Sequence, residues 1–129
     1  MRKHLIIIDD DPIFRLLTIK MVSKLDLPDL KLHECENGQV GIRALEQLSE
    51  VNENVSVFLD INTPVLNGWE FLEKSKQNNY FNIKNLQVFI ISSSTDDDDI
   101  DKANNHNIVK RFIHKPLKLS KLKSILVES

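Results

Sequence analysis

The chain has 129 residues, of which 41% are hydrophobic and 28% charged, as is usual for one soluble globular domain. A net charge of -2 gives no signature of binding to nucleic acid or membranes, and a single cysteine excludes an intramolecular disulfide and a thiolate metal cluster. The apolar runs are too short to cross a bilayer, and the run after Arg2 and Lys3 soon meets three aspartates, which argues against an export signal, so we expect a cytoplasmic protein.

Five strand–helix units follow one another along the chain. Residues 5–8 form a continuous apolar run, typical of a strand covered on both faces, and the run leads into three aspartates and Pro12. Asp11 is expected to be the N-cap of the helix that begins there. The apolar residues of this helix recur at helical spacing and predict an amphipathic helix: Ile13, Leu16, Leu17, Met21 and Leu25.

The second and third units repeat this pattern. Residues 30–35 alternate between apolar and polar side chains, which favours a strand near the edge of a sheet. Residues 55–59 form a short apolar strand that ends at Asp60. Because Pro64 cannot lie in a central strand, Asp60 is expected where the strand gives way to a loop. A helical pattern follows each of the two strands.

The last two units complete the domain. Residues 86–91 predict a fourth buried strand, and the aspartates at 96–99 then open a short helix whose dipole they are expected to complement. Residues 109–113 predict the fifth strand, and a terminal helix follows it. Such alternation predicts an α/β fold, with a parallel five-stranded sheet, right-handed crossovers and helices on both faces.

Polar side chains end four of the five predicted strands. They are Asp9 and Asp10 after the first strand, Asp60 after the third, Ser92 after the fourth and Lys115 after the fifth. The carboxyl ends of parallel strands lie at one edge of a sheet, so these groups are expected to meet. Three crowded carboxylates resist ionisation unless a cation lies among them, and an all-oxygen cluster favours Mg²⁺. A carboxylate can also be a nucleophile that forms an aspartyl phosphate.

Four motifs together resemble a known family. LIIIDDDP, VFLDINTPVLNG, VFIISSS and FIHKP are similar, in order and spacing, to the motifs of the receiver domain of two-component response regulators. The resemblance covers the whole chain and implies a doubly wound, flavodoxin-like sheet with strand order 2-1-3-4-5. It further implies a single receiver domain over residues 1–129. Because the chain ends one helix after Lys115, no output domain is expected.

The resemblance also implies a role for each acidic residue. Asp60 would be the phosphorylation site. Asp10 would bind Mg²⁺ directly, Asp9 largely through water, and Asn62 would offer its backbone carbonyl. Thr63 stands where the family often has methionine, a departure expected to matter little.

The remaining implied roles lie on the last two strands. Ser92, where the family often has threonine, matches the switch hydroxyl, and Lys115 matches the family's lysine. Phe112 falls at the aromatic switch position, and the Lys115–Pro116 peptide bond is expected to be cis. The four aspartates at 96–99 are unusual at this position and could weaken or redirect the docking of a partner.

The function implied is that of a stand-alone response regulator. It would accept a phosphoryl group on Asp60 from a sensor histidine kinase or a histidine phosphotransfer protein, with Mg²⁺. It would then switch a protein-binding surface on the fourth helix, fifth strand and fifth helix for an unknown downstream protein, or relay the phosphoryl group. It would not turn over external substrates, and neither nucleic acid nor membrane is an expected partner.

Two alternatives remain open. One is a phosphatase of the haloacid-dehalogenase type, whose motif residues 60–63 loosely resemble, although the second aspartate and room for a cap domain are missing. The other is an unphosphorylated interaction module on the same fold. The four histidines have no mutual metal-binding spacing and are expected to be ordinary strand or surface residues: His4, His33, His106 and His114. Cys35 is expected to be a small buried residue.

Overall fold

A computed structural model describes residues 2–83 and 85–127 of the chain. Five strands and five helices alternate along it, with one short 3₁₀ helix, η1, at Tyr80–Asn82. The strands are β1 (Lys3–Ile8), β2 (Leu30–Cys35), β3 (Asn54–Leu59), β4 (Gln87–Ser92) and β5 (Val109–His114). The helices are α1 (Pro12–Ser23), α2 (Gly38–Leu48), α3 (Gly68–Gln77), α4 (Asp97–Asn104) and α5 (Leu119–Leu126).

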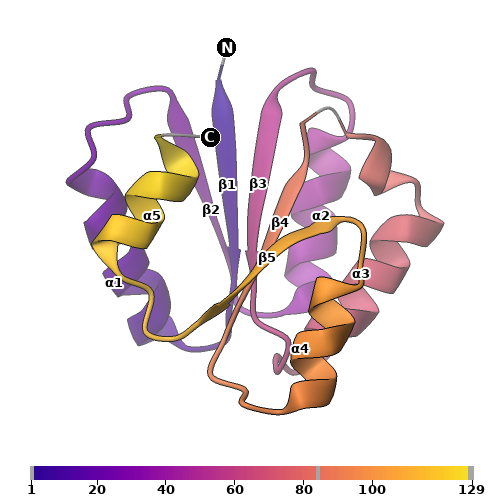
Figure 1. Ribbon diagram of the computed structural model, residues 1–129. Coiled ribbons are helices and arrows are strands. Elements are labelled where there is room, and N and C mark those ends of the chain that lie inside the picture. Colours follow the sequence, from indigo (N-terminus) through magenta and orange to yellow (C-terminus); the bar gives the residue numbers. More distant parts are fainter. Residues whose placement is uncertain (1, 84, 128–129) are drawn as a thin grey trace.

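The five strands form one parallel sheet in the order β2-β1-β3-β4-β5. Helices α1 and α5 cover one face, and α2, α3 and α4 cover the other (Figure 1). The predicted fold and strand order are confirmed. The alternating strand β2 lies at an edge of the sheet, as its pattern predicts, and β5 forms the opposite edge.

The sheet divides the hydrophobic core into two layers. Along β1, Ile6 and Ile8 pack towards α2 and α3, whereas Leu5 and Ile7 pack towards α1 and α5. All four side chains are fully buried, which explains why the strand is apolar without alternation.

Only part of the apolar face predicted for α1 is buried: Met21 and Leu25 pack against the core, and the other three residues do not. Ile13, Leu16 and Leu17 are 65%, 51% and 54% exposed. The buried residues of the helix are Thr18 and Val22, and the Thr18 hydroxyl donates a hydrogen bond of 2.8 Å to the Phe14 carbonyl oxygen. Because that hydroxyl is satisfied within the helix, a polar residue can face the core, and a second apolar stripe is left on the surface.

Asparagine and aspartate side chains begin four of the helices. The predicted cap Asp11 accepts a hydrogen bond from the Ile13 backbone N–H. Asn67 accepts one from the Glu70 backbone N–H, and the Glu70 carboxylate accepts one in return from the Asn67 N–H, which completes a capping box. Asn37 and Asp96 cap α2 and α4 by accepting hydrogen bonds from the backbone N–H groups of Val40 and Asp98. These caps fix where each loop at the carboxyl edge of the sheet enters its helix.

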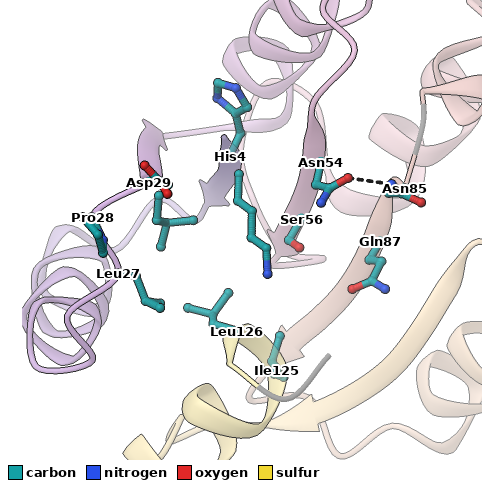
Figure 2. Close-up of a pocket in the computed structure, with 12 residues that line it drawn as sticks. His4, Leu27, Pro28, Asp29, Asn54, Ser56, Asn85, Gln87, Ile125 and Leu126 are labelled. Atoms are coloured by element: carbon teal, nitrogen blue, oxygen red, sulfur yellow. Dashed lines mark hydrogen bonds between the residues drawn. The ribbon is translucent and has the colours of Figure 1, made fainter. Parts of the chain in front are cut away.

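A cavity of about 410 Å³ lies at the amino ends of the strands, at the edge opposite to Asp60. In Figure 2, Ile125 and Leu126 of α5 face Asn54 and Asn85 across it. The Asn85 amide donates a hydrogen bond of 2.6 Å to the Asn54 side chain. Within the described residues, no helix is both long and apolar enough to span a bilayer.

Candidate functional site

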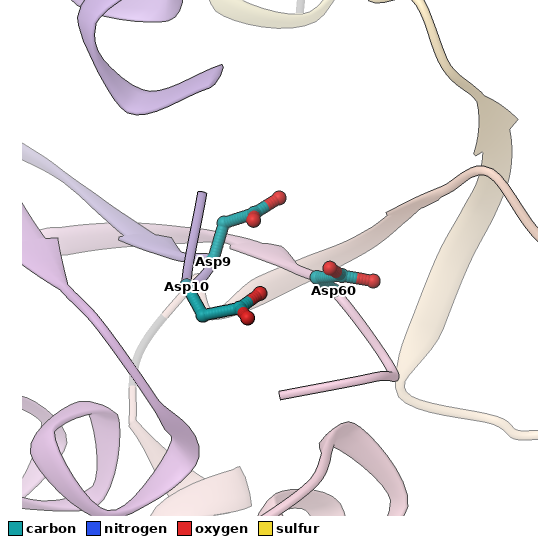
Figure 3. A group of neighbouring side chains, drawn as sticks. All are labelled: Asp9, Asp10 and Asp60. Atoms are coloured by element: carbon teal, nitrogen blue, oxygen red, sulfur yellow. The ribbon is translucent and has the colours of Figure 1, made fainter. Parts of the chain in front are cut away.

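Three carboxylates converge at the carboxyl edge of the sheet. Asp9 and Asp10 follow β1, and Asp60 follows the neighbouring strand β3. One carboxylate oxygen from each residue lies within 4.8 Å of the other two (Figure 3). The two strands pair in parallel to their last residues, Ile8 with Leu59, and this register places Asp9 and Asp60 side by side.

The Asp9 carboxylate is buried, and both of its oxygens have partners. Oδ1 accepts a hydrogen bond of 2.9 Å from the Asp11 backbone N–H, and Oδ2 lies 2.7 Å from Lys115 Nζ. The Arg15 guanidinium donates to the Asp9 carbonyl oxygen at 2.6 Å and to Glu34 on β2 at 3.2 Å. Asp9 is therefore held on three sides, whereas Asp10 is exposed and makes none of the described hydrogen bonds.

Asp60 is also buried but less strongly held. Its Oδ1 accepts a long hydrogen bond of 3.3 Å from the Asn62 N–H, and its Oδ2 lies 3.6 Å from Lys115 Nζ. Burial and the neighbouring charge of Asp9 raise the pKa of Asp60, and the Lys115 ammonium only partly opposes them. An added cation at this position would relieve that repulsion.

Lys115 is the cation that faces the carboxylates. Burial alone would lower its pKa, but the hydrogen bond to Asp9 and the charges of Asp60 and Asp9 outweigh burial, so the pKa of Lys115 is raised. Its Nζ also lies 4.6 Å from the centre of the Phe14 ring. A backbone hydrogen bond of 2.9 Å from Lys115 N to the Ser92 carbonyl oxygen ties this residue to β4, and the Lys115–Pro116 peptide bond is cis.

The predicted switch residues lie on the two neighbouring strands. Ser92 ends β4 and is fully buried, and its hydroxyl oxygen accepts a hydrogen bond of 3.0 Å from the Ser94 N–H. Phe112 lies on β5 beside Ile90 of β4 and packs edge-on against His114, with ring centroids 5.0 Å apart. The structure thus places Ser92 at the same edge as Asp60, with Phe112 two residues below that edge.

A polar contact links α3, α4 and the loop after β4, and the sequence reasoning missed it. The Trp69 indole N–H donates to Asp99 at 3.3 Å, and the Ser94 hydroxyl donates to the other Asp99 oxygen at 2.9 Å. Lys102 Nζ lies 4.7 Å above the Trp69 ring. Asp99, expected only to complement the helix dipole, therefore also anchors the loop that follows Ser92.

The sequence reasoning also missed a contact between two histidines on the neighbouring strands β1 and β2. His4 is buried, and its Nδ1 lies 2.9 Å from Nε2 of His33, while its Nε2 lies 3.0 Å from the Glu53 carboxylate. The carboxylate can only accept, so His4 donates through Nε2. Burial, together with the charges of His4 and Lys31, lowers the pKa of His33. The register pairs His4 with Lys31 and Ile6 with His33, so the contact joins residues that are offset along the two strands.

The donor set of the acidic cluster suits a hard divalent cation. Three carboxylates crowd together with no histidine or cysteine among them, and a hard ion such as Mg²⁺ prefers oxygen ligands. Burial first, and then the charge of Asp9, raise the pKa of Asp60, and Lys115 alone does not offset them. The residues present therefore fit Mg²⁺, which would be held by carboxylate oxygens of this cluster.

Comparisons with known proteins agree with this geometry. The family model described as "Response regulator receiver domain" matches residues 5–127. A solved two-component response regulator from Cytophaga hutchinsonii is 26% identical, with a TM-score of 0.83 over 98% of this chain and 96% of that chain.

Two further solved structures support the fold alone. A response regulator receiver protein from Dyadobacter fermentans is 23% identical (TM-score 0.80), and the Mn²⁺-bound form of response regulator Rcp1 is 22% identical (TM-score 0.77). Each covers 98% of this chain and 96% of its own. Among curated proteins, none matches the chain.

Proposed function

The chain belongs to the response regulator receiver domain family, and we propose that Asp60 accepts a phosphoryl group. The donor is a phosphohistidine on a sensor kinase or a phosphotransfer protein. The observation that carries the proposal is the arrangement of Asp60, Asp9 and Lys115. A buried carboxylate faces a cation at 3.6 Å, and a second carboxylate holds that cation at 2.7 Å. Lys115 can therefore stay near Asp60 while a negative group approaches.

The acidic cluster is proposed to hold Mg²⁺. Asp10 is the best direct ligand, because both oxygens of Asp9 already have protein partners and those of Asp10 have none described. Asp60 and the backbone carbonyl of Asn62 complete the protein ligands, and Asp9 acts through water. The ion would supply charge compensation for the phosphoryl oxygens.

The transfer step itself uses the side chains of this chain. An Asp60 carboxylate oxygen attacks phosphorus, the bond from phosphorus to the donor imidazole nitrogen breaks, and the imidazole keeps the electron pair. The Asn62 N–H orients Oδ1 of Asp60, and the Lys115 ammonium offsets negative charge on the phosphoryl group. The result is an aspartyl phosphate, so the phosphoryl group stays on this chain after the transfer.

A switch at the last two strands is proposed to follow. The Ser92 hydroxyl accepts a hydrogen bond from Ser94 and still has its own proton to donate. Donation to a phosphoryl oxygen on Asp60 would draw Ser92 and its loop towards the site and leave space beside Phe112. Inward rotation of Phe112 would then alter the surface of α4, β5 and α5, as a shift between two states of the domain.

The exposed stripe on α1 is proposed to receive the phosphodonor. Ile13, Leu16 and Leu17 form an apolar surface on the helix that begins two residues after Asp10. Exposed apolar patches of this kind mark protein contacts, and this one adjoins the acidic cluster. We expect Leu17→Glu to slow transfer from a phosphohistidine protein and to leave phosphorylation by acetyl phosphate unchanged.

Labelling with a small phosphodonor tests the central step. Wild-type protein incubated with acetyl phosphate and Mg²⁺ should gain one phosphoryl group by mass spectrometry, and Asp60→Asn should gain none. Asp26→Asn is the matched control, because Asp26 is exposed and remote from the cluster. Labelling of Asp60→Asn at the wild-type level would refute the assignment. Steady hydrolysis of unrelated phosphomonoesters would instead favour the phosphatase alternative.

A further inference from the structure

Charge is strongly segregated along the last third of the chain. Five aspartates lie in or beside α4, at 96–99 and 101. Residues 102–127 contain no aspartate or glutamate, and their cations are Lys102, Lys110, Arg111, Lys115, Lys118, Lys121 and Lys123. In a chain with a net charge of -2, β5 and α5 therefore form a distinctly basic region.

A groove of about 310 Å³ lies within this basic region. It runs between β5 and the start of α5, and its lining includes Arg111, His114, Lys118 and Lys121 but no acidic residue. Arg111, Lys118 and Lys121 are exposed, so a ligand can reach all three charges. The first N–H groups of α5 also lack a side-chain cap and add positive potential nearby.

The groove follows an open edge of the sheet. Strand β5 pairs with β4 on one side and with no other described strand. An edge strand offers backbone N–H and C=O groups to an extended peptide, which can add to the sheet as a further strand. Lys110 and Arg111 on this strand discourage pairing with neutral or basic strands, and they leave an acidic segment as the matched partner.

We propose that this groove binds a short acidic peptide segment of a partner protein, in an extended conformation along β5. A long polyanion such as DNA or RNA fits less well, because α4 packs beside β5 and carries the aspartate run. The backbone phosphates of a nucleic acid that extended beyond the groove to α4 would be repelled by these carboxylates. A short peptide can stay within the groove.

The groove shares a side chain with the proposed switch. Phe112 lines the groove, and it is the residue proposed to rotate after Asp60 is phosphorylated. Rotation of Phe112 would change the floor of the groove, so peptide affinity should depend on the state of Asp60. This coupling rests on the proposed function, whereas peptide binding to the unphosphorylated chain does not.

Fluorescence anisotropy with a defined probe tests the binding. The probe is a fluorescein-labelled peptide of about eight residues that alternates glutamate with valine, long enough to extend along the six residues of β5. We expect saturable binding that weakens with added salt. Arg111→Glu, Lys118→Glu and Lys121→Glu, combined in one variant, should weaken binding about tenfold or more.

Matched controls separate this site from general charge. Lys20→Glu, Arg43→Glu and Lys74→Glu make the same charge change at exposed positions on α1, α2 and α3 and should leave affinity unchanged. The same peptide N-methylated at alternate residues cannot pair with β5 through its main chain and should bind weakly. Equal binding by both triple variants, or by both peptides, would overturn the proposal.

Two separate results would each identify a different occupant of the groove. Tighter binding of a single-stranded oligonucleotide than of the peptide would overturn the proposal in favour of nucleic acid. Concentration-dependent dimerisation, abolished by the groove variant, would assign the groove to a second copy of this chain. Beryllofluoride with Mg²⁺ should shift peptide affinity in the wild type and not in Asp60→Asn. Loss of the shift alone contradicts the coupling, whereas loss of Asp60 labelling contradicts the proposed function.

Discussion

The ammonium nitrogen of Lys115 lies 2.7 Å from a carboxylate oxygen of Asp9 and so joins the end of β5 to the end of β1. The Asp9 side chain is 1% exposed and that of Lys115 20%. An ion pair this buried adds little over an apolar pair, but loss of one partner leaves the other charge uncompensated. The site therefore depends on Lys115 for its integrity as well as for its chemistry.

Substitution of Lys115 by Met should destabilise the protein when no divalent cation is present. The buried Asp9 carboxylate would lose its cation, and we expect a fall of about 3 kcal/mol in the free energy of unfolding, measured by urea denaturation in EDTA. Mg²⁺ should recover part of the loss. Lys110→Met, at an exposed position on β5, should stay within about 0.5 kcal/mol of wild type. Equal effects of the two substitutions would contradict the ion-pair argument.

Asp60→Asn should stabilise the metal-free protein at pH 7. The pKa of Asp60 is raised by folding, so above its usual value of 3.8 the folded state holds more protons than the unfolded state. Stability therefore falls as pH rises through the raised pKa, and an asparagine avoids this loss. We expect a gain on the order of 1 kcal/mol at pH 7 that shrinks towards pH 4. Mg²⁺ should stabilise wild type and narrow the gap, and a variant less stable than wild type in EDTA would contradict the argument.

His33 should make the fold sensitive to mild acid. Its pKa is lowered in the folded state, so between that value and its usual 6.5 the unfolded state holds more protons. Stability is full above pH 6.5 and is lost as pH falls below it. Because His33 is partly exposed, the loss should be below about 1 kcal/mol. The free energy of unfolding, measured by urea denaturation, should fall less between pH 7 and pH 5 in His33→Gln than in wild type. His114→Gln should show the same fall as wild type.

Trp69, the only tryptophan, should report the state of the phosphorylation site by its fluorescence. Its indole N–H bonds Asp99, Asp99 accepts from the Ser94 hydroxyl, and the Ser94 N–H bonds Ser92. Movement of Ser92 on binding of Mg²⁺ and beryllofluoride should therefore alter Trp69 emission.

Asp99→Asn should reduce this emission change and lower stability by about 1 kcal/mol. Asp97→Asn, on an exposed residue of the same helix, is the matched control and should preserve both. An undiminished response in Asp99→Asn would show that Trp69 senses the site by another route.

The parts of the fold that the sequence predicted are those governed by local pattern. Continuous apolar runs indicated buried strands, and their alternation with helices indicated a parallel sheet, so the convergence of Asp9, Asp10 and Asp60 followed from topology. The apolar face predicted for α1 was only partly right, because that helix is apolar on two sides, and only packing against the sheet selects Thr18 for the core.

Contacts between side chains far apart in the sequence could not be predicted in this way. The bond from Trp69 to Asp99 joins two helices whose relative rotation is set by the core beneath them. The pair His4 and His33 depends on the register between β1 and β2, which pattern alone does not supply.

The loop after Asp60 contains a three-residue turn around Val65, closed by a hydrogen bond of 2.7 Å from Leu66 N to the Pro64 carbonyl oxygen. Val65 has a φ of 68°, a conformation that a β-branched residue adopts only under strain, and its side chain is 79% exposed. Glycine would relieve that strain, by roughly 1 kcal/mol. The chain thus gives up stability in the loop that follows Asp60 while exposing an apolar side chain there, so substitutions at Val65 could change this surface with little cost to the core.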